Sequence, residues 1–164
     1  MKRLRLNPEF FRRHLAVCVL MFGMGCWFGY DGFVAYPSTP AGELYEKIEK
    51  AKPQEGFDLD AFKRQKIQSQ YGFAAACLLA SALIALNLAS VAAFRFEYDE
   101  TGFVWRGKRR ALADIRSVDR SQWRKKGIAK LALADGGRVT LDAWHHLGVR
   151  DFEKLLPPPQ GAER

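Results

Sequence analysis

Two long apolar stretches constrain the fold of this chain more than any other feature. Residues 15–36 contain a single charged side chain, Asp31, and residues 71–94 contain none. A helix needs about 20 mostly apolar residues to cross the roughly 30 Å of bilayer hydrocarbon, and both stretches are long enough. Aromatic residues collect towards their ends, which is typical of spanning helices at the membrane interface. The sequence therefore predicts two transmembrane helices, over 15–36 and 71–94.

A secretory signal peptide is the alternative for the first stretch, because basic residues precede it. The apolar run is too long for a signal peptide, however, and no small-x-small cleavage site follows it. Phe33 and Ala35 stand where two small residues would be needed. We therefore expect the first stretch to remain in the mature protein as a span.

Charge counts on the three flanking segments predict the orientation. Residues 1–14 carry five basic residues against one acid, and residues 37–70 carry six of each. Residues 95–164 carry 15 basic residues against 10 acids. Because positively charged flanks stay in the cytoplasm, we expect a cytoplasmic basic head, an external loop over 37–70 and a cytoplasmic tail. The expected location is the inner (cytoplasmic) membrane of a cell.

The external loop is predicted to be largely helical. Ser38-Thr39-Pro40 is a helix-start signal, with a hydroxyl cap followed by proline at the first helical position. Asp58 or Asp60 is expected to cap a second helix that continues into the second span. The loop is either a solvated connector or a contact surface for an external partner, and its composition favours the connector.

Small residues occur at regular spacing inside both apolar stretches. They let helix backbones approach closely, which is how helices associate when lipid competes for apolar contact. The two sets could pack against each other within one hairpin, form a homo-oligomer or receive a neighbouring subunit. The predicted packing residues are Gly25 and Gly29 in the first span and Ser81, Ala85 and Ala89 in the second.

From residue 95 the apolar pattern changes from continuous to alternating, which indicates β-strands. Residues 96–105 predict one hairpin around the turn 99–102, and residues 129–141 predict another around Asp135-Gly136-Gly137. A further strand is expected over 113–118. Residues 149–156 predict a short amphipathic helix that Pro157 stops. A disordered tail is expected over 157–164.

Strands followed by one closing helix, beginning directly after a membrane span, resemble the bacterial pleckstrin-homology-like (PH-like) domain. The resemblance covers about 60 residues of the tail, over 95–156. It rests on four segments: 96–103, 114–118, 131–136 and 152–156. The expected fold is therefore a membrane α-helical hairpin of two transmembrane helices. A small antiparallel β (PH-like) cytoplasmic domain, closed by a short C-terminal helix, follows that hairpin.

The resemblance implies a scaffold or binding module, because members of this family are usually not catalysts. Eukaryotic relatives often bind phosphoinositide headgroups through basic residues of the first strand-to-strand loop. Basic clusters near a membrane attract anionic lipid headgroups, although a cytoplasmic tail is expected to be basic without any ligand. The candidate lipid- or partner-binding residues are Arg106, Lys108, Arg109, Arg110, Trp123, Arg124, Lys125 and Lys126.

The sequence contains no pattern that predicts catalysis. It has no nucleophile elbow, no P-loop and no dinucleotide-binding glycine motif. The adjacent His145 and His146 point opposite ways on an extended segment, and no cysteine or third histidine lies nearby to complete a metal site. We expect no catalytic residue, no metal and no cofactor. The formal net charge is +8, but acidic residues are interspersed among the basic ones. We therefore expect no nucleic-acid partner.

These observations predict a non-enzymatic inner-membrane protein whose PH-like domain binds another protein, as an accessory or assembly subunit of a membrane complex. The expected partners are the lipid bilayer and either a protein partner or a second copy of the chain. The alternative is a membrane-surface module that recognises anionic lipid headgroups through its basic loops.

Overall fold

The structure is a computed structural model that describes residues 1–157. The predicted disordered tail lies outside the described residues, apart from Pro157. The chain divides into two compact units. We call residues 14–87 the helical unit, and we call residues 1–13 together with the chain from Leu88 onward the β unit.

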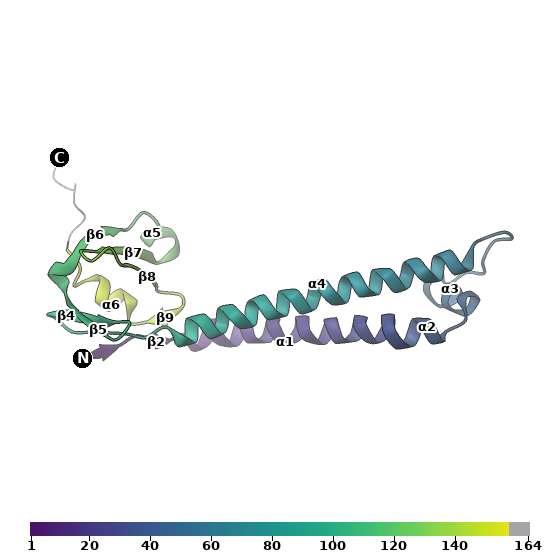
Figure 1. Ribbon diagram of the computed structural model, residues 1–164, viewed down its shortest axis with the longest axis horizontal. Coiled ribbons are helices and arrows are strands. Elements are labelled where there is room, and N and C mark those ends of the chain that lie inside the picture. Colours follow the sequence, from purple (N-terminus) through teal and green to yellow (C-terminus); the bar gives the residue numbers. More distant parts are fainter. Residues whose placement is uncertain (158–164) are drawn as a thin grey trace. The chain divides into compact units, whose positions relative to one another are not determined.

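Two long helices build the helical unit, which Figure 1 draws in purple to teal. Both are long and apolar enough to cross a membrane, and only 11% and 22% of their most apolar windows are buried. The core helix of a soluble protein would have most of its apolar surface buried, and these two helices do not. The helical elements are α1 (Pro8–Tyr30), the π-helical segment η1 (Asp31–Ala35), α2 (Tyr36–Ser38), α3 (Ala41–Glu49) and α4 (Leu59–Ala93).

The two long helices contact each other through small residues. A Cβ built on Gly25 would lie 2.7 Å from Leu78 Cγ, so only glycine allows this approach. The Ser81 hydroxyl donates a hydrogen bond of 3.1 Å to the Cys18 carbonyl oxygen. Polar contacts of this kind hold helices together where water is absent. The two helices therefore form a tightly packed antiparallel hairpin within the helical unit.

The connection between the helices confirms one predicted cap and corrects the other. Asp58 Oδ1 accepts a hydrogen bond of 2.8 Å from the Ala61 amide, so this carboxylate caps α4 as expected. At the start of α3, by contrast, no side chain caps the helix and Pro40 precedes its first residue. The Thr39 hydroxyl instead donates to the Ala35 carbonyl at 2.8 Å. The hydroxyls therefore stabilise the end of the preceding helix, not the start of the next.

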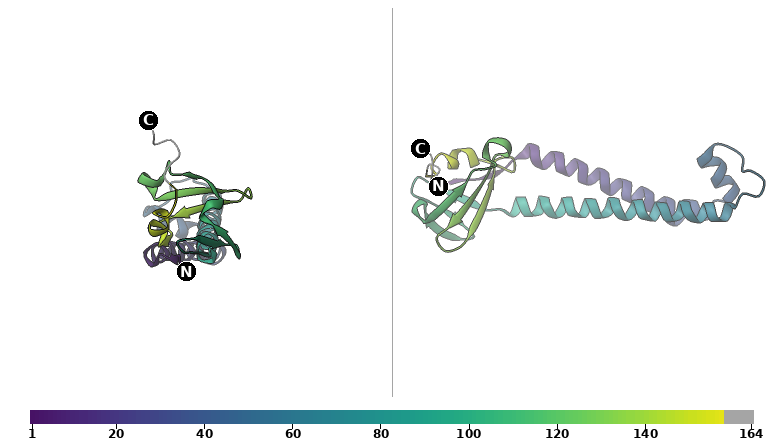
Figure 2. Two further views of the ribbon diagram at one scale, coloured as in Figure 1. Left: turned by 90° about the vertical axis from the view of Figure 1, so that its left-hand side faces the viewer. Right: turned by 90° about the horizontal axis from the view of Figure 1, so that it is seen from above.

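Antiparallel sheets make up most of the β unit, as the alternating sequence predicted. One sheet has the strand order β1-β3-β4-β5, a second has the order β6-β7-β8, and β2 pairs with β9. Figure 2 shows these strands gathered in one compact part of the chain. The strands are β1 (Lys2–Arg3), β2 (Arg5–Leu6), β3 (Phe96–Tyr98), β4 (Gly102–Trp105), β5 (Lys108–Ala111), β6 (Ile115–Asp119), β7 (Ile128–Leu133), β8 (Arg138–Asp142) and β9 (His146–Leu147).

The N-terminal residues are part of the β unit, so the predicted separate head over 1–14 needs correction. β1 pairs with β3, Lys2 lying opposite Tyr98. β2 pairs with β9 at the other end of the chain. Leu4, between the two strands, is 3% exposed and belongs to the hydrophobic core. The head therefore completes the β domain as well as carrying basic charge.

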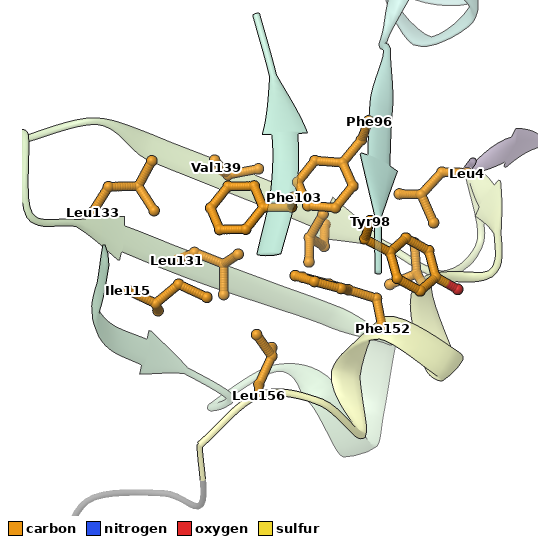
Figure 3. Close-up of a cluster of buried hydrophobic side chains, with 12 residues drawn as sticks. Leu4, Phe96, Tyr98, Phe103, Ile115, Leu131, Leu133, Val139, Phe152 and Leu156 are labelled. Carbon is orange, nitrogen blue, oxygen red and sulfur yellow. The ribbon is translucent and has the colours of Figure 1, made fainter. Parts of the chain in front are cut away.

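The core of the β unit is closed by the short helix α6 (Val149–Glu153). Figure 1 shows α6 between the two larger sheets, and Figure 3 shows Phe152 pointing into the aromatic side chains of β3 and β4. The Phe152 ring lies 4.9 Å from that of Phe96 and 5.9 Å from that of Phe103. Phe152 therefore joins the helix to the first sheet through edge-on aromatic contacts.

Three elements of the tail differ from the sequence prediction. The predicted basic loop over 106–110 is mostly a strand, since β5 begins at Lys108. The segment after β6 contains one helical turn, α5 (Trp123–Lys126). The closing helix ends at Glu153, earlier than the predicted limit of Leu156, although Leu156 still joins the core.

Candidate functional site

The first predicted basic cluster is divided between two faces of the hairpin β4–β5. Arg106 and Gly107 form its turn, with φ values of 52° and 73°. Two consecutive residues with positive φ are typical of the tight turns that match the twist of antiparallel strands. Because side chains alternate along β5, its basic residues cannot all face one ligand. The four residues therefore do not form one binding surface.

Two members of this cluster are held by carboxylates of the same unit. Arg109 Nη2 lies 3.0 Å from Asp99 Oδ2. Arg110 Nη2 lies 2.7 Å from Asp135 Oδ2, and its side chain is only 11% exposed. These pairs connect neighbouring turns of the β unit. Arg109 and Arg110 therefore each have an acidic partner, whereas no ion pair engages Arg106 or Lys108 within residues 1–157.

The second predicted cluster forms the helical turn α5. Trp123 packs against the hydrophobic core and is half-buried. Part of its indole ring is therefore engaged in the core of the β unit. The three basic residues that follow, Arg124, Lys125 and Lys126, are exposed. They remain available for an anionic surface, and they lie on a different element from the first cluster.

A pocket at the end of α4 gathers arginines that the sequence analysis did not place together. It has a volume of about 680 Å³ and contains the side chains of Arg95, Arg106 and Arg138. Trp105 also lines it, and the Arg106 guanidinium lies 4.6 Å from the centre of the Trp105 ring. We call this the arginine pocket. Its three cations come from the α4–β3 junction, the β4–β5 turn and the start of β8.

The first loop of the β3–β4 hairpin is acidic, unlike the basic loop that the PH resemblance suggests. Asp99 Oδ1 accepts hydrogen bonds from the Thr101 hydroxyl at 2.7 Å and the Gly102 amide at 3.0 Å. The hydrogen bonds from Thr101 are the main reason that the pKa of Asp99 falls to about 2. The loop therefore keeps a fixed negative charge, which makes it a poor site for a phosphate group.

The predicted helix-packing residues separate into two groups. Gly25 and Ser81 lie inside the hairpin, as described above. Ala85 and Ala89 are exposed, and a Cβ built on Gly29 would meet no atom within 4 Å. The structure therefore uses two of the five residues for packing within the chain and leaves the other three facing outward.

The first residues of α1 and the last residues of α4 are held in the β unit by aromatic and histidine contacts. Phe10 of α1 is 1% exposed, and its ring lies 4.4 Å from that of His145. His146 is 6% exposed, and its Nε2–H donates a hydrogen bond of 3.1 Å to the Val91 carbonyl of α4. Burial lowers the pKa of His146, so the neutral ring is the form that fits this position.

Mild acid should therefore destabilise the β unit through His146. Its pKa in the folded protein is below the unfolded value of 6.5. The unfolded state consequently binds more protons as pH falls below that value, and stability declines towards the folded pKa. We expect the melting temperature of the β unit to fall as the pH is lowered from 7.5 to 5. Calorimetry of His146→Gln should show a flatter pH profile, and an unchanged slope would contradict this role.

No group of three or more histidine, cysteine, aspartate or glutamate residues that could hold a metal ion occurs within residues 1–157. Comparison with family models, curated proteins and solved structures found no match to this chain.

Proposed function

We propose that this chain is a non-enzymatic, two-span protein of the inner membrane that serves as an accessory or assembly subunit of a membrane complex. Both termini would lie in the cytoplasm, with the β unit acting as a PH-like interaction domain. The observation that carries the proposal is the exposure of the small residues that the hairpin does not use. The antiparallel sheets and closing helix are compatible with the PH-like expectation.

The outward-facing small residues offer a surface for another helix. Gly29 on α1 and Ala85 and Ala89 on α4 have little side chain to hold a neighbouring helix away. α1 also carries an apolar groove of about 560 Å³. Its lining residues are Val19, Leu20, Gly23, Met24, Trp27 and Phe28. An apolar groove containing a glycine matches the close approach that membrane helices use.

The connection between the two units supports a role for the β unit at the membrane surface. The boundaries after Arg13 and after Asn87 both fall inside continuous helices, α1 and α4. Helical backbone therefore continues from the β unit into both proposed spans. A domain fastened to two membrane helices in this way would meet its partners at the membrane.

The proposal is tested by purifying the full-length protein from its native membrane in mild detergent. We expect a stoichiometric protein partner, or a second copy of the chain, to elute with it. In the double variant Ala85→Leu/Ala89→Leu, recovery of that partner should fall at least tenfold, which corresponds to about 1.4 kcal/mol. Mass spectrometry of the eluted proteins measures the ratio.

Ala76→Leu provides the matched control. Ala76 is also exposed on α4, but it lies nine residues from Ala85 and so on roughly the opposite face of the helix. The control introduces a leucine on the other face of the helix and should retain the partner. A wild-type protein that elutes alone as a monomer would contradict the proposal.

A further inference from the structure

We propose that the arginine pocket binds the phosphate group of an anionic lipid headgroup. This inference requires the membrane placement proposed above, but it does not require a protein partner. The volume of about 680 Å³ is within the range of small-molecule sites. The residues that carry the argument are Arg95, Arg106 and Arg138, together with Trp105 and Phe94.

The charge of the pocket is uncompensated. Three arginines and no acidic residue line it. Other arginines of the same unit do have acidic partners, such as Arg120, whose Nε lies 2.8 Å from Glu153 Oε1. Within residues 1–157, by contrast, no ion pair engages the three pocket arginines. Guanidinium groups match the geometry of phosphate oxygens, so a phosphate would supply the missing partner.

The end of α4 offsets only part of this positive charge. A helix C-terminus carries the equivalent of roughly half a negative charge, which favours nearby cations. One of the three arginines is therefore enough to complement the helix end. The remaining charge favours an anion.

The position of the pocket along the chain selects a lipid as the source of the phosphate. α4 ends at Ala93, and the predicted second span ends one residue later at Phe94. Phe94, Arg95 and Trp105 then line the pocket. A headgroup in the pocket could therefore keep its acyl chains along the apolar surface of α4. The Arg106 guanidinium stacks on the Trp105 ring, which holds this cation in place. An indole ring has an apolar body and a polar N–H, so it is well suited to the interface between lipid and water.

The test compares two charge-matched triple variants of the full-length protein in mild detergent. Arg95→Gln/Arg106→Gln/Arg138→Gln removes the pocket charges. Arg124→Gln/Lys125→Gln/Lys126→Gln removes three exposed charges from α5. Native mass spectrometry during titration with phosphatidylglycerol measures affinity, and phosphatidylcholine and inorganic phosphate serve as comparison ligands.

We expect the wild-type protein to bind phosphatidylglycerol in preference to phosphatidylcholine. The pocket variant should lose roughly 100-fold in affinity, because each basic residue near an anionic headgroup contributes about fivefold. The α5 variant should lose less than about threefold. Circular dichroism should show the same fold for all three proteins, since the pocket arginines are exposed.

Three results would overturn the proposal. Equal losses in both variants would mean that only total charge matters. A larger loss in the α5 variant would place the site at the second basic cluster. Equal competition by inorganic phosphate would show that the pocket does not select a lipid. Failure of membrane placement itself would be seen separately, as release of the protein from native membranes by alkaline extraction.

Discussion

Phe152→Ala is expected to destabilise the β unit by about 3–5 kcal/mol, which is the usual cost of truncating a fully buried phenylalanine. The Phe152 side chain is 0% exposed. Its ring contacts those of Phe96, Tyr98 and Phe103, the nearest centre lying 4.9 Å away. Truncation would leave a cavity between α6 and the first sheet. Because domains of this size have a total stability of about 5–15 kcal/mol, the effect is a large fraction of it.

Urea unfolding of the full-length protein in detergent, followed by near-ultraviolet circular dichroism, measures this effect. At a slope of about 1.5 kcal/mol per molar urea, the unfolding midpoint should fall by about 2–3 M. Phe152→Leu is the control, because it keeps most of the apolar volume and should cost less than about 1.5 kcal/mol. A midpoint for Phe152→Ala within about 0.5 M of the wild type would show that α6 does not close the core.

The sequence predicted those parts of the fold that are encoded locally. Length and continuous apolar character indicated the two long helices without reference to any other residue. Alternation over 96–105 and 129–141 indicated β3, β4, β7 and β8, because side chains of a strand half-buried in a sheet alternate between core and solvent. The Asp99 and Asp135 turns were visible because carboxylates that accept backbone hydrogen bonds are typical of turns.

β1, β2 and β5 could not be predicted this way. β1 and β2 have two residues each, which is too short to show any period. The pairing of β1 with β3 places Lys2 opposite Tyr98, which is more than half of the chain away in sequence. β5 consists of Lys108, Arg109, Arg110 and Ala111, a composition that indicates a loop. It becomes a strand because the Arg106–Gly107 turn places it beside β4 and because two of its arginines have carboxylate partners.

The arginine pocket was missed for a similar reason. Consecutive basic residues are easy to see in a sequence, but Arg95, Arg106 and Arg138 are far apart in the chain. Of these three, only Arg106 belonged to a predicted cluster. One local signal did exist, because Arg95 is the first charged residue after the second apolar stretch. Only the pairing of strands shows that two further arginines reach the same end of the β unit.

Leu4→Asp should unfold the β unit, because the N-terminal segment contributes to its core. The Leu4 side chain is 3% exposed, and its amide donates a hydrogen bond of 3.0 Å to the Phe96 carbonyl. A carboxylate at this position would lose its hydration without gaining a partner, at a cost of several kcal/mol. We expect trypsin to cleave the β unit of the full-length variant at least tenfold faster than that of the wild type, because more of it is unfolded at equilibrium.

Arg5→Asp is the control that separates packing from charge. Arg5 is exposed on β2, so an aspartate there keeps access to water. It lowers the charge of the N-terminal segment by two units, whereas Leu4→Asp lowers it by one. If the segment acted only as a basic cytoplasmic flank, Arg5→Asp would be the more harmful change. If Arg5→Asp keeps the β unit resistant to trypsin and Leu4→Asp does not, the N-terminal segment is a part of this domain. If only Arg5→Asp becomes sensitive to trypsin, the segment is a separate basic head, as the sequence predicted.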